Sequence, residues 1–196
     1  MDGVLYNSMP NHAVAWQKSM EQFDIHMTAD DAYATEGARG VDTIKKMVKA
    51  QQHRDIGEEE AQRMYDVKTS IFHEMPVAQI FDGVKELMQK IKDCGMKIGV
   101  VTGSGQRPLI ARLINDFGDF ITEERIVTAY DVKNGKPAPD PYLMGMQKVG
   151  TTPFETIVVE NAPLGVKAGV AAGSFTIAVN SGPLPDSALA EQGANI

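Results

Sequence analysis

Residues 1–8 read Met-Asp-Gly-Val-Leu-Tyr-Asn-Ser, and this stretch decides how the rest of the chain is interpreted. Three later segments agree with it: Val-Thr-Gly-Ser at 101–104, Gly-Lys-Pro-Ala-Pro-Asp at 135–140, and Val-Val-Glu-Asn-Ala-Pro-Leu-Gly at 158–165. All four fall where an apolar run gives way to polar residues and glycine, so each is expected to follow a buried strand.

The second half of the chain alternates between short apolar runs and amphipathic stretches. The alternation predicts a parallel sheet with helices on both faces, and sites in such sheets lie beyond the carboxyl ends of the strands. Asp140 is expected to cap the helix that starts at Pro141. The predicted strands are 97–101, 126–129, 156–159 and 175–179, and the predicted helices are 109–117, 141–149, 164–172 and 184–192.

Residues 9 to about 80 have a different pattern. Segments 12–23, 41–51 and 58–72 show helical periodicity, and no strand-like run separates them. The chain is therefore expected to contain an all-helical unit inserted into an α/β unit, with crossings near residues 8–10 and 79–83.

In this order, the four segments resemble the motifs of the haloacid dehalogenase superfamily of phosphoryl-transfer enzymes. The resemblance implies a Rossmann-like core (1–8 and 81–196) and a helical cap domain (9–80). In that family the first motif reads Asp-x-Asp-Gly, so Asp2 matches its second aspartate. The nucleophilic aspartate is then expected immediately before Met1, at the end of a central strand contributed by residues upstream. The sequence is therefore expected to be cut at both ends.

The resemblance also assigns roles at the reacting phosphoryl group. Asp2 is expected to be the general acid and base, whereas by itself it reads as a turn aspartate before Gly3. A phosphate is bound well by backbone amides and hydroxyl groups that lie between the end of a strand and the start of a helix. A lysine that two neighbouring prolines hold in place also suits a phosphate. The phosphate-binding residues are therefore predicted to be Thr102, Gly103, Ser104 and Lys136.

A magnesium ion is the expected cofactor. The resemblance implies that the backbone carbonyl of Asp2 is one of its ligands. Glu160, Asn161 and Glu36 are the other predicted ligands, because Mg²⁺ prefers oxygen donors and keeps several waters. Asn161 stands where the family usually has aspartate, so the site loses one negative charge. Glu36 lies in the loop 35–40, which contains two glycines, and is predicted to supply the missing negative charge. The alternative interpretation is that Glu36 is a solvated loop residue.

The cap supplies three further candidates. His12 resembles the histidine that gates the catalytic aspartate in β-phosphoglucomutase, although a packing role is also open. Arg39 lies one place before the position of the sugar-phosphate-binding arginine of that enzyme and could substitute for it. Lys68 either faces the cleft or lies on a solvated helix face.

Glu36 before Gly37, combined with the Glu160-Asn161 pair, resembles most closely a haloacid-dehalogenase-type inorganic pyrophosphatase. The predicted function is thus a Mg²⁺-dependent phosphohydrolase acting through an aspartyl phosphate on pyrophosphate. The alternatives are a β-phosphoglucomutase, a small sugar-phosphate phosphatase, and, should the nucleophile be absent, a phosphate-binding pseudoenzyme.

Composition bounds the remaining classes. The chain has 196 residues and is 43% hydrophobic, as is ordinary for a globular protein. A net charge of -7 argues against nucleic-acid binding, and no apolar run is long enough for a membrane span. The only cysteine, Cys94, excludes an intrachain disulfide, is expected to be buried, and fits a cytoplasmic location. The sequence is compatible with a monomer and leaves the oligomeric state open.

Overall fold

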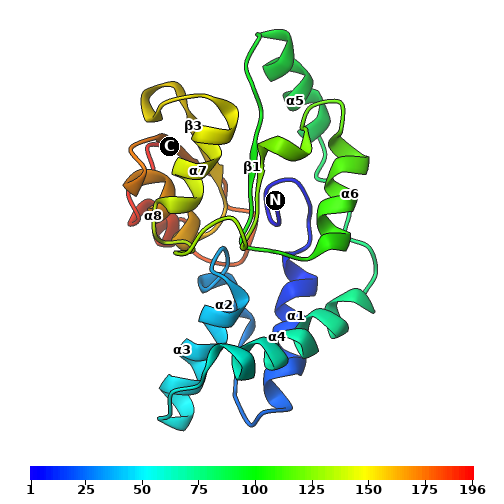
Figure 1. Cartoon of the computed structure of the whole chain (residues 1–196), viewed down its shortest axis with the longest axis vertical. Helices are drawn as coiled ribbons and strands as arrows, with labels where there is room; N and C mark the ends of the chain where they lie inside the picture. The colour runs from blue at the N-terminus through cyan, green and yellow to red at the C-terminus, as the bar shows by residue number, and fades with distance from the viewer.

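The computed structural model describes residues 1–196 and has two parts (Figure 1). The lower part in that view is entirely helical. It consists of α1 (Met9–Glu21), α2 (Ala29–Ala34), α3 (Gly40–Gln52) and α4 (Glu58–His73). None of the helices of the chain is both long enough and apolar enough to cross a membrane.

One hydrophobic cluster holds the helical part together. Met20 and Val48 have no exposed surface, and Trp16 is buried beside them. Apolar residues recur at helical spacing along α1, α3 and α4, and this periodicity allowed these three helices to be predicted. The other buried members of the cluster are Ala13, Ile25, Met27, Ala32, Val41, Ile44, Met47, Ala61 and Met64.

Helix α2 was not predicted. It has six residues, which is too short for a periodic pattern to stand out. The local signal for it is a capping box: the Thr28 hydroxyl accepts a hydrogen bond from the Asp31 N–H at 3.1 Å, and the Asp31 carboxylate accepts one from the Thr28 N–H at 2.9 Å.

The upper part alternates helices with short parallel strands, as predicted, although the helix at residues 84–93 was not predicted. Its helices are α5 (Val84–Asp93), α6 (Arg107–Phe117), α7 (Asp140–Val149), α8 (Pro163–Ala171) and α9 (Asp186–Ala190). Its strands are β1 (Val100–Val101), β2 (Ile126–Val127), β3 (Ile157–Glu160) and β4 (Phe175–Ala178), and two 3₁₀ turns, η1 (Glu123–Arg125) and η2 (Pro153–Glu155), precede β2 and β3.

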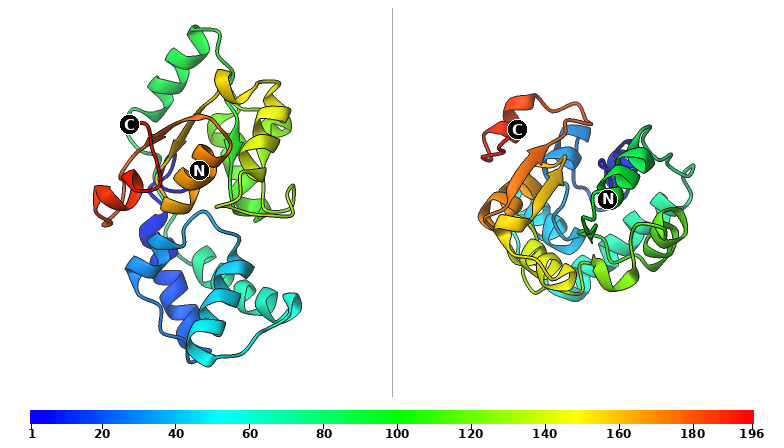
Figure 2. Two further views of the ribbon diagram at one scale, coloured as in Figure 1. Left: turned by 90° about the vertical axis from the view of Figure 1, so that its left-hand side faces the viewer. Right: turned by 90° about the horizontal axis from the view of Figure 1, so that it is seen from above.

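The expected single sheet is divided into two. β1 pairs in parallel with β2, and β3 pairs in parallel with β4, but no ladder joins the two pairs. Figure 2 shows the chain around β1 (green) and the chain around β3 and β4 (yellow to orange) on opposite sides of the middle of the upper part. No strand formed by residues 1–196 lies between the pairs, and Ile157 remains 59% exposed. The central strand expected upstream of Met1 stays a prediction.

The chain crosses between the two parts at two neighbouring points. The Asn7 N–H donates to the Gln79 carbonyl at 2.8 Å, and the Phe81 N–H donates to the Leu5 carbonyl at 3.0 Å. Tyr6 forms an antiparallel bridge with Ile80 between these bonds. The two crossings therefore lie side by side and are tied to each other through their backbones.

Two details of the sequence interpretation were wrong. Cys94 is exposed, because it follows the last turn of α5 at the surface rather than the core-facing side. Asp140 does not cap α7 but is its first residue, and its carboxylate accepts a hydrogen bond from the Asn134 side chain at 2.9 Å.

Candidate active site

A cavity of about 80 Å³ lies where the helical part meets the ends of β1 and β3. All four sequence segments reach it, as does the loop between α2 and α3. Ten of the eleven residues predicted for the site line this cavity: Asp2, His12, Glu36, Lys68, Thr102, Gly103, Ser104, Lys136, Glu160 and Asn161.

Asp2 lies in the tight turn formed by residues 1–6. Gly3 has a φ of +68°, which a residue with a side chain rarely adopts, and so it lets the chain reverse directly after the aspartate. The Asp2 carboxylate accepts a hydrogen bond from the Ser8 hydroxyl at 2.5 Å and has His12 Nε2 at 3.2 Å, although that nitrogen is not aligned as a hydrogen-bond donor. Burial raises the pKa of Asp2, but the Nε2–H side of His12 and the hydrogen bond from Ser8 favour the charged carboxylate, and the pKa is lowered overall.

His12 connects Asp2 with a buried lysine. Lys68 Nζ lies 2.6 Å from His12 Nδ1. An ammonium group can only donate, so Nδ1 accepts this bond and the ring proton of neutral His12 lies on Nε2, which faces Asp2. Burial and the charge of Lys68 lower the pKa of His12, consistent with the neutral ring.

Lys68 itself lies among aromatic rings. Its ammonium group is 5.3 Å from the centre of the Trp16 ring, 5.8 Å from that of Tyr65 and 5.0 Å from that of Phe72. Only 2% of Lys68 is exposed, and burial lowers its pKa to about 8. Cation–π attraction offsets part of the cost of removing the charge from water. Lys68 therefore faces the cavity and does not lie on a solvated helix face.

The segment after β1 has the form of an anion site. Thr102 and Ser104 are buried; Thr102 Oγ1 accepts a hydrogen bond from the Ser104 N–H at 3.1 Å, and Ser104 Oγ accepts one from the Gln106 N–H at 3.3 Å. These bonds leave both hydroxyl protons free to donate into the cavity. Gly103 lies against the cap loop: a Cβ there would be 2.6 Å from the carbonyl oxygen of Gly37.

Lys136 and Glu160 form a buried ion pair. Lys136 Nζ donates to Glu160 Oε1 at 2.5 Å and also approaches the Val101 carbonyl at 3.4 Å. The second carboxylate oxygen, Oε2, accepts from the backbone N–H groups of Asn161 and Ala162 at 3.0 and 3.3 Å. Burial raises the pKa of Glu160, but Lys136 outweighs this effect and the pKa is lowered overall.

Asn161 joins the upper part to the loop between α2 and α3. Its side-chain amide donates to both carboxylate oxygens of Glu36, at 3.0 Å each. Burial raises the pKa of Glu36 to about 8; the bond with Asn161 opposes the rise, and the charges of Glu160 and Asp2 add to it. Burial is thus the main reason that Glu36 resists ionisation, and a cation bound beside it would favour the charged carboxylate again.

Only some of the predicted magnesium ligands are arranged in a way that suits the ion. No three His, Cys, Asp or Glu side chains lie close enough together to hold a metal by themselves. Asp2, Glu36 and Asn161, which all carry oxygen donors, nevertheless line one cavity, and a magnesium ion that keeps several waters needs few protein ligands. Glu160 fits less well, since both of its carboxylate oxygens already accept hydrogen bonds.

Arg39 is the predicted site residue that the structure places elsewhere. Its guanidinium donates to Asp42 at 2.7 and 2.8 Å, in a fork-shaped pair on the first turn of α3, and it does not line the cavity. Asp42 engages two of the five guanidinium N–H donors, and the role of Arg39 as a substitute for a phosphate-binding arginine stays a prediction.

The sequence interpretation missed Ser8 and Tyr142, whose hydroxyl groups donate hydrogen bonds to carboxylates of the site. Ser8 donates to Asp2, and Tyr142 donates to Glu160 Oε1 at 2.5 Å. Ser8 was identifiable as the polar residue that ends the first motif, whereas Tyr142 looks like an ordinary aromatic core residue of α7.

Comparison with known proteins places the chain in a family. Its residues 1–179 match the model of the haloacid dehalogenase-like hydrolases. Hexitol phosphatase A of Escherichia coli (strain K12) is 32% identical over 181 residues, which cover 92% of this chain and 81% of that protein. A β-phosphoglucomutase of Bacillus subtilis (strain 168) is 24% identical over 93% of this chain and 81% of that protein.

A solved structure agrees with these relatives. It comes from Bacteroides vulgatus, is provisionally named β-phosphoglucomutase, and superposes with a TM-score of 0.95 at 48% sequence identity. The match covers 100% of this chain and 79% of that one. The family match spans well over half of the sequence and includes all four segments that meet at the cavity. The chain therefore belongs to the haloacid dehalogenase-like hydrolases.

Proposed function

We propose that this protein is a Mg²⁺-dependent phosphohydrolase for a small phosphorylated substrate, with residues 1–8 and 81–196 as its core and residues 9–80 as its cap. The observation that carries the proposal is the meeting of an acidic group, hydroxyl donors and a lysine in one small cavity. Phosphoryl transfer requires charge neutralisation, positioning and a proton donor, and these residues can supply all three.

Asp2 is the proposed acid and base. In the cavity as it stands its carboxyl is ionised, which suits activation of water. A phosphorylated substrate brings negative charge beside it, and a like charge raises the pKa of a carboxyl, so substrate binding favours the protonated form that can donate to the leaving oxygen. Transfer through an aspartyl phosphate needs, in addition, the nucleophilic aspartate of the family's first motif.

Lys136, Thr102 and Ser104 are proposed to hold the transferring phosphoryl group. All three residues line the cavity from the ends of neighbouring segments, where a phosphate can also meet backbone N–H groups. The main-chain carbonyl of Asp2 and the side chains of Asn161 and Glu36 are proposed to hold the magnesium ion. When bound, it would supply positive charge to neutralise the phosphoryl oxygens.

The proposed substrate is inorganic pyrophosphate. Glu36 projects into the cavity beside Asn161, while Arg39, the cation that could hold a sugar phosphate, is paired with Asp42. A carboxylate repels phosphate unless a cation lies between them, so the cap loop favours a compact, metal-bound substrate over a hexose phosphate.

A second candidate is a small sugar phosphate, either hydrolysed or isomerised. The names of the relatives favour it, since they are a hexitol phosphatase and β-phosphoglucomutases. Lys68 is the one buried cation of the cap and lines the cavity, so it offers a place for the second charged group of such a substrate.

The test is a comparison of turnover by the full-length protein with magnesium present. Pyrophosphate, hexitol phosphates and β-glucose 1-phosphate with a trace of the 1,6-bisphosphate are supplied in parallel. Preferred release of phosphate from pyrophosphate supports the first candidate. Preferred release from a hexitol phosphate, or formation of glucose 6-phosphate, supports the second, and no turnover of any of them would leave a phosphate-binding protein without catalysis.

A further inference from the structure

Tyr142 lies in the first turn of α7, with its ring in the core and its hydroxyl group at the site. The residue is 8% exposed, and its ring packs in a cluster with Met146, Val158 and Ala168. The cluster fixes the ring between α7, β3 and α8. The hydroxyl group makes one hydrogen bond, to Glu160 Oε1 at 2.5 Å.

Glu160 is held by four donors. Oε1 accepts from Tyr142 and Lys136, and Oε2 accepts from the N–H groups of Asn161 and Ala162. The side chain also lies against Gly165, where an added Cβ would be 2.1 Å from Glu160 Cδ. The carboxylate is thus fixed in position and direction, and it serves as an anchor for the groups that bind it.

Tyr142 contacts both members of the ion pair. Lys136 Nζ lies 4.9 Å from the centre of the Tyr142 ring, in addition to its bond with Glu160. The lysine is 7% exposed and has a four-carbon stem, which without fixed partners can adopt many rotamers. Its direction in the cavity therefore depends on the tyrosine and the glutamate together.

We propose that Tyr142 is a positioning residue: its hydroxyl group fixes Glu160, which aims Lys136 at the phosphoryl group and orients the backbone of Asn161. This inference rests on the proposed function, because it assigns a part in phosphate binding to a residue outside the four motif segments. Neither the ring packing nor α7 requires the hydroxyl group, since phenylalanine would fill the same space.

Tyr142→Phe is the test, with Tyr130→Phe as the matched control. Tyr130 is 81% exposed on the loop after β2 and does not line the cavity. Both variants and the unsubstituted full-length protein are titrated with inorganic phosphate by calorimetry, and kcat and KM are measured with the better substrate. We expect Tyr142→Phe to weaken phosphate binding and to lower kcat by about 10- to 100-fold, the usual effect of losing a supporting partner of a site residue. Tyr130→Phe should change neither.

A second comparison separates positioning from a purely structural role. If Tyr142 acts through Glu160, then Glu160→Gln alone and Tyr142→Phe combined with Glu160→Gln should lose phosphate affinity by the same factor. Losses that multiply would overturn the proposal, as would Tyr142→Phe retaining phosphate affinity and kcat within about twofold. Thermal unfolding of each variant is followed in parallel, and a midpoint close to that of the unsubstituted protein is expected for Tyr142→Phe.

The two proposals fail in different ways. If the unsubstituted protein neither binds phosphate nor turns over any substrate, the proposed function is wrong, and the positioning role of Tyr142 is then wrong as well. If the unsubstituted protein is active and Tyr142→Phe matches it, only the positioning role is wrong.

Discussion

The side chain of Asn161, at the end of β3, donates two hydrogen bonds to the carboxylate of Glu36, in the loop between α2 and α3. The same loop touches the segment after β1, where Gly103 approaches the Gly37 carbonyl. The cavity is therefore bordered by contacts between residues that are far apart in the sequence. Any metal or substrate that binds there meets the cap loop and the strand ends at the same time.

Replacing Glu36 by alanine should change substrate preference. Loss of the carboxylate removes a proposed oxygen ligand and leaves the cap loop less negative. We expect turnover of pyrophosphate to fall by about 10- to 100-fold more than turnover of sugar phosphates. The ratio of the two kcat/KM values measures the effect.

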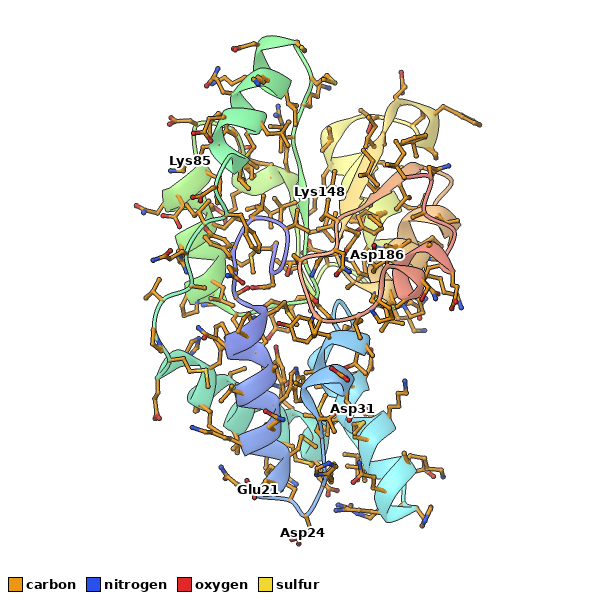
Figure 3. The ribbon with its side chains drawn as sticks, turned by 180° about the vertical axis from the view of Figure 1, so that it is seen from behind. Glu21, Asp24, Asp31, Lys85, Lys148 and Asp186 are labelled. Atoms are coloured by element: carbon orange, nitrogen blue, oxygen red, sulfur yellow. The ribbon has the colours of Figure 1, made fainter.

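Glu21→Ala is the control for this change. Glu21 ends α1 at the end of the helical part remote from the strands (Figure 3), so the ratio should stay unchanged. An equal loss on both substrates in Glu36→Ala would mean that this glutamate does not set specificity.

Replacing Asp2 by asparagine should abolish most turnover while the protein stays folded. Asparagine has nearly the same shape but cannot accept or donate the proton, and positioned acid–base groups contribute about 10²- to 10⁴-fold to rate. Steady-state kinetics should show a loss of kcat of that size, and circular dichroism should show an unchanged spectrum. Retention of near-normal kcat would remove Asp2 from the proton-transfer step.

Replacing Lys68 by methionine should alter how stability depends on pH. Burial lowers the pKa of Lys68 from 10.5 to about 8, so the folded protein releases this proton at a lower pH than the unfolded chain. Between these values the unfolded state binds more protons, and the free energy of unfolding therefore gains a contribution that rises with pH. The full shift corresponds to at most about 3 kcal/mol.

Urea unfolding of both proteins at pH values on either side of this window measures the contribution. At the lower pH, Lys68→Met should be the more stable protein, because methionine fills a similar space among Trp16, Tyr65 and Phe72 without burying a charge. The advantage should shrink as the pH rises. A difference that is independent of pH would show that Lys68 has an ordinary pKa in the folded state.

The sequence predicted what local patterns can encode. Periodicity indicated α1, α3 and α4, and the motif segments indicated which residues line the cavity, because their spacing places them at the ends of parallel strands. The pattern could not show that Arg39 pairs with Asp42, since that depends on the rotamers of one helical turn. Nor could it show that Glu160 is surrounded by four donors, one of which, Tyr142, belongs to a helix whose face reads as ordinary core.

Replacing Gly165 by alanine should disturb the network around Glu160. In most helical positions this change stabilises a protein, because alanine has the better helix propensity. At position 165 the added Cβ would lie 2.1 Å from Glu160 Cδ, and the four donors prevent that carboxylate from moving aside without losing hydrogen bonds. We expect a loss of about 1–3 kcal/mol in the free energy of unfolding, typical of overpacking, together with reduced turnover.

Gly57→Ala provides the matched comparison. Gly57 precedes α4, has a φ of -75°, and would have no atom within 4 Å of an added Cβ. Its replacement should cost less than about 1 kcal/mol and leave kcat unchanged, because only the preference for glycine over alanine at a helix N-cap is lost. Urea unfolding and kinetics of the two variants decide the matter. If Gly165→Ala were as stable and as active as Gly57→Ala, Glu160 would be free to move, and the anchoring role inferred from its four hydrogen bonds would be wrong.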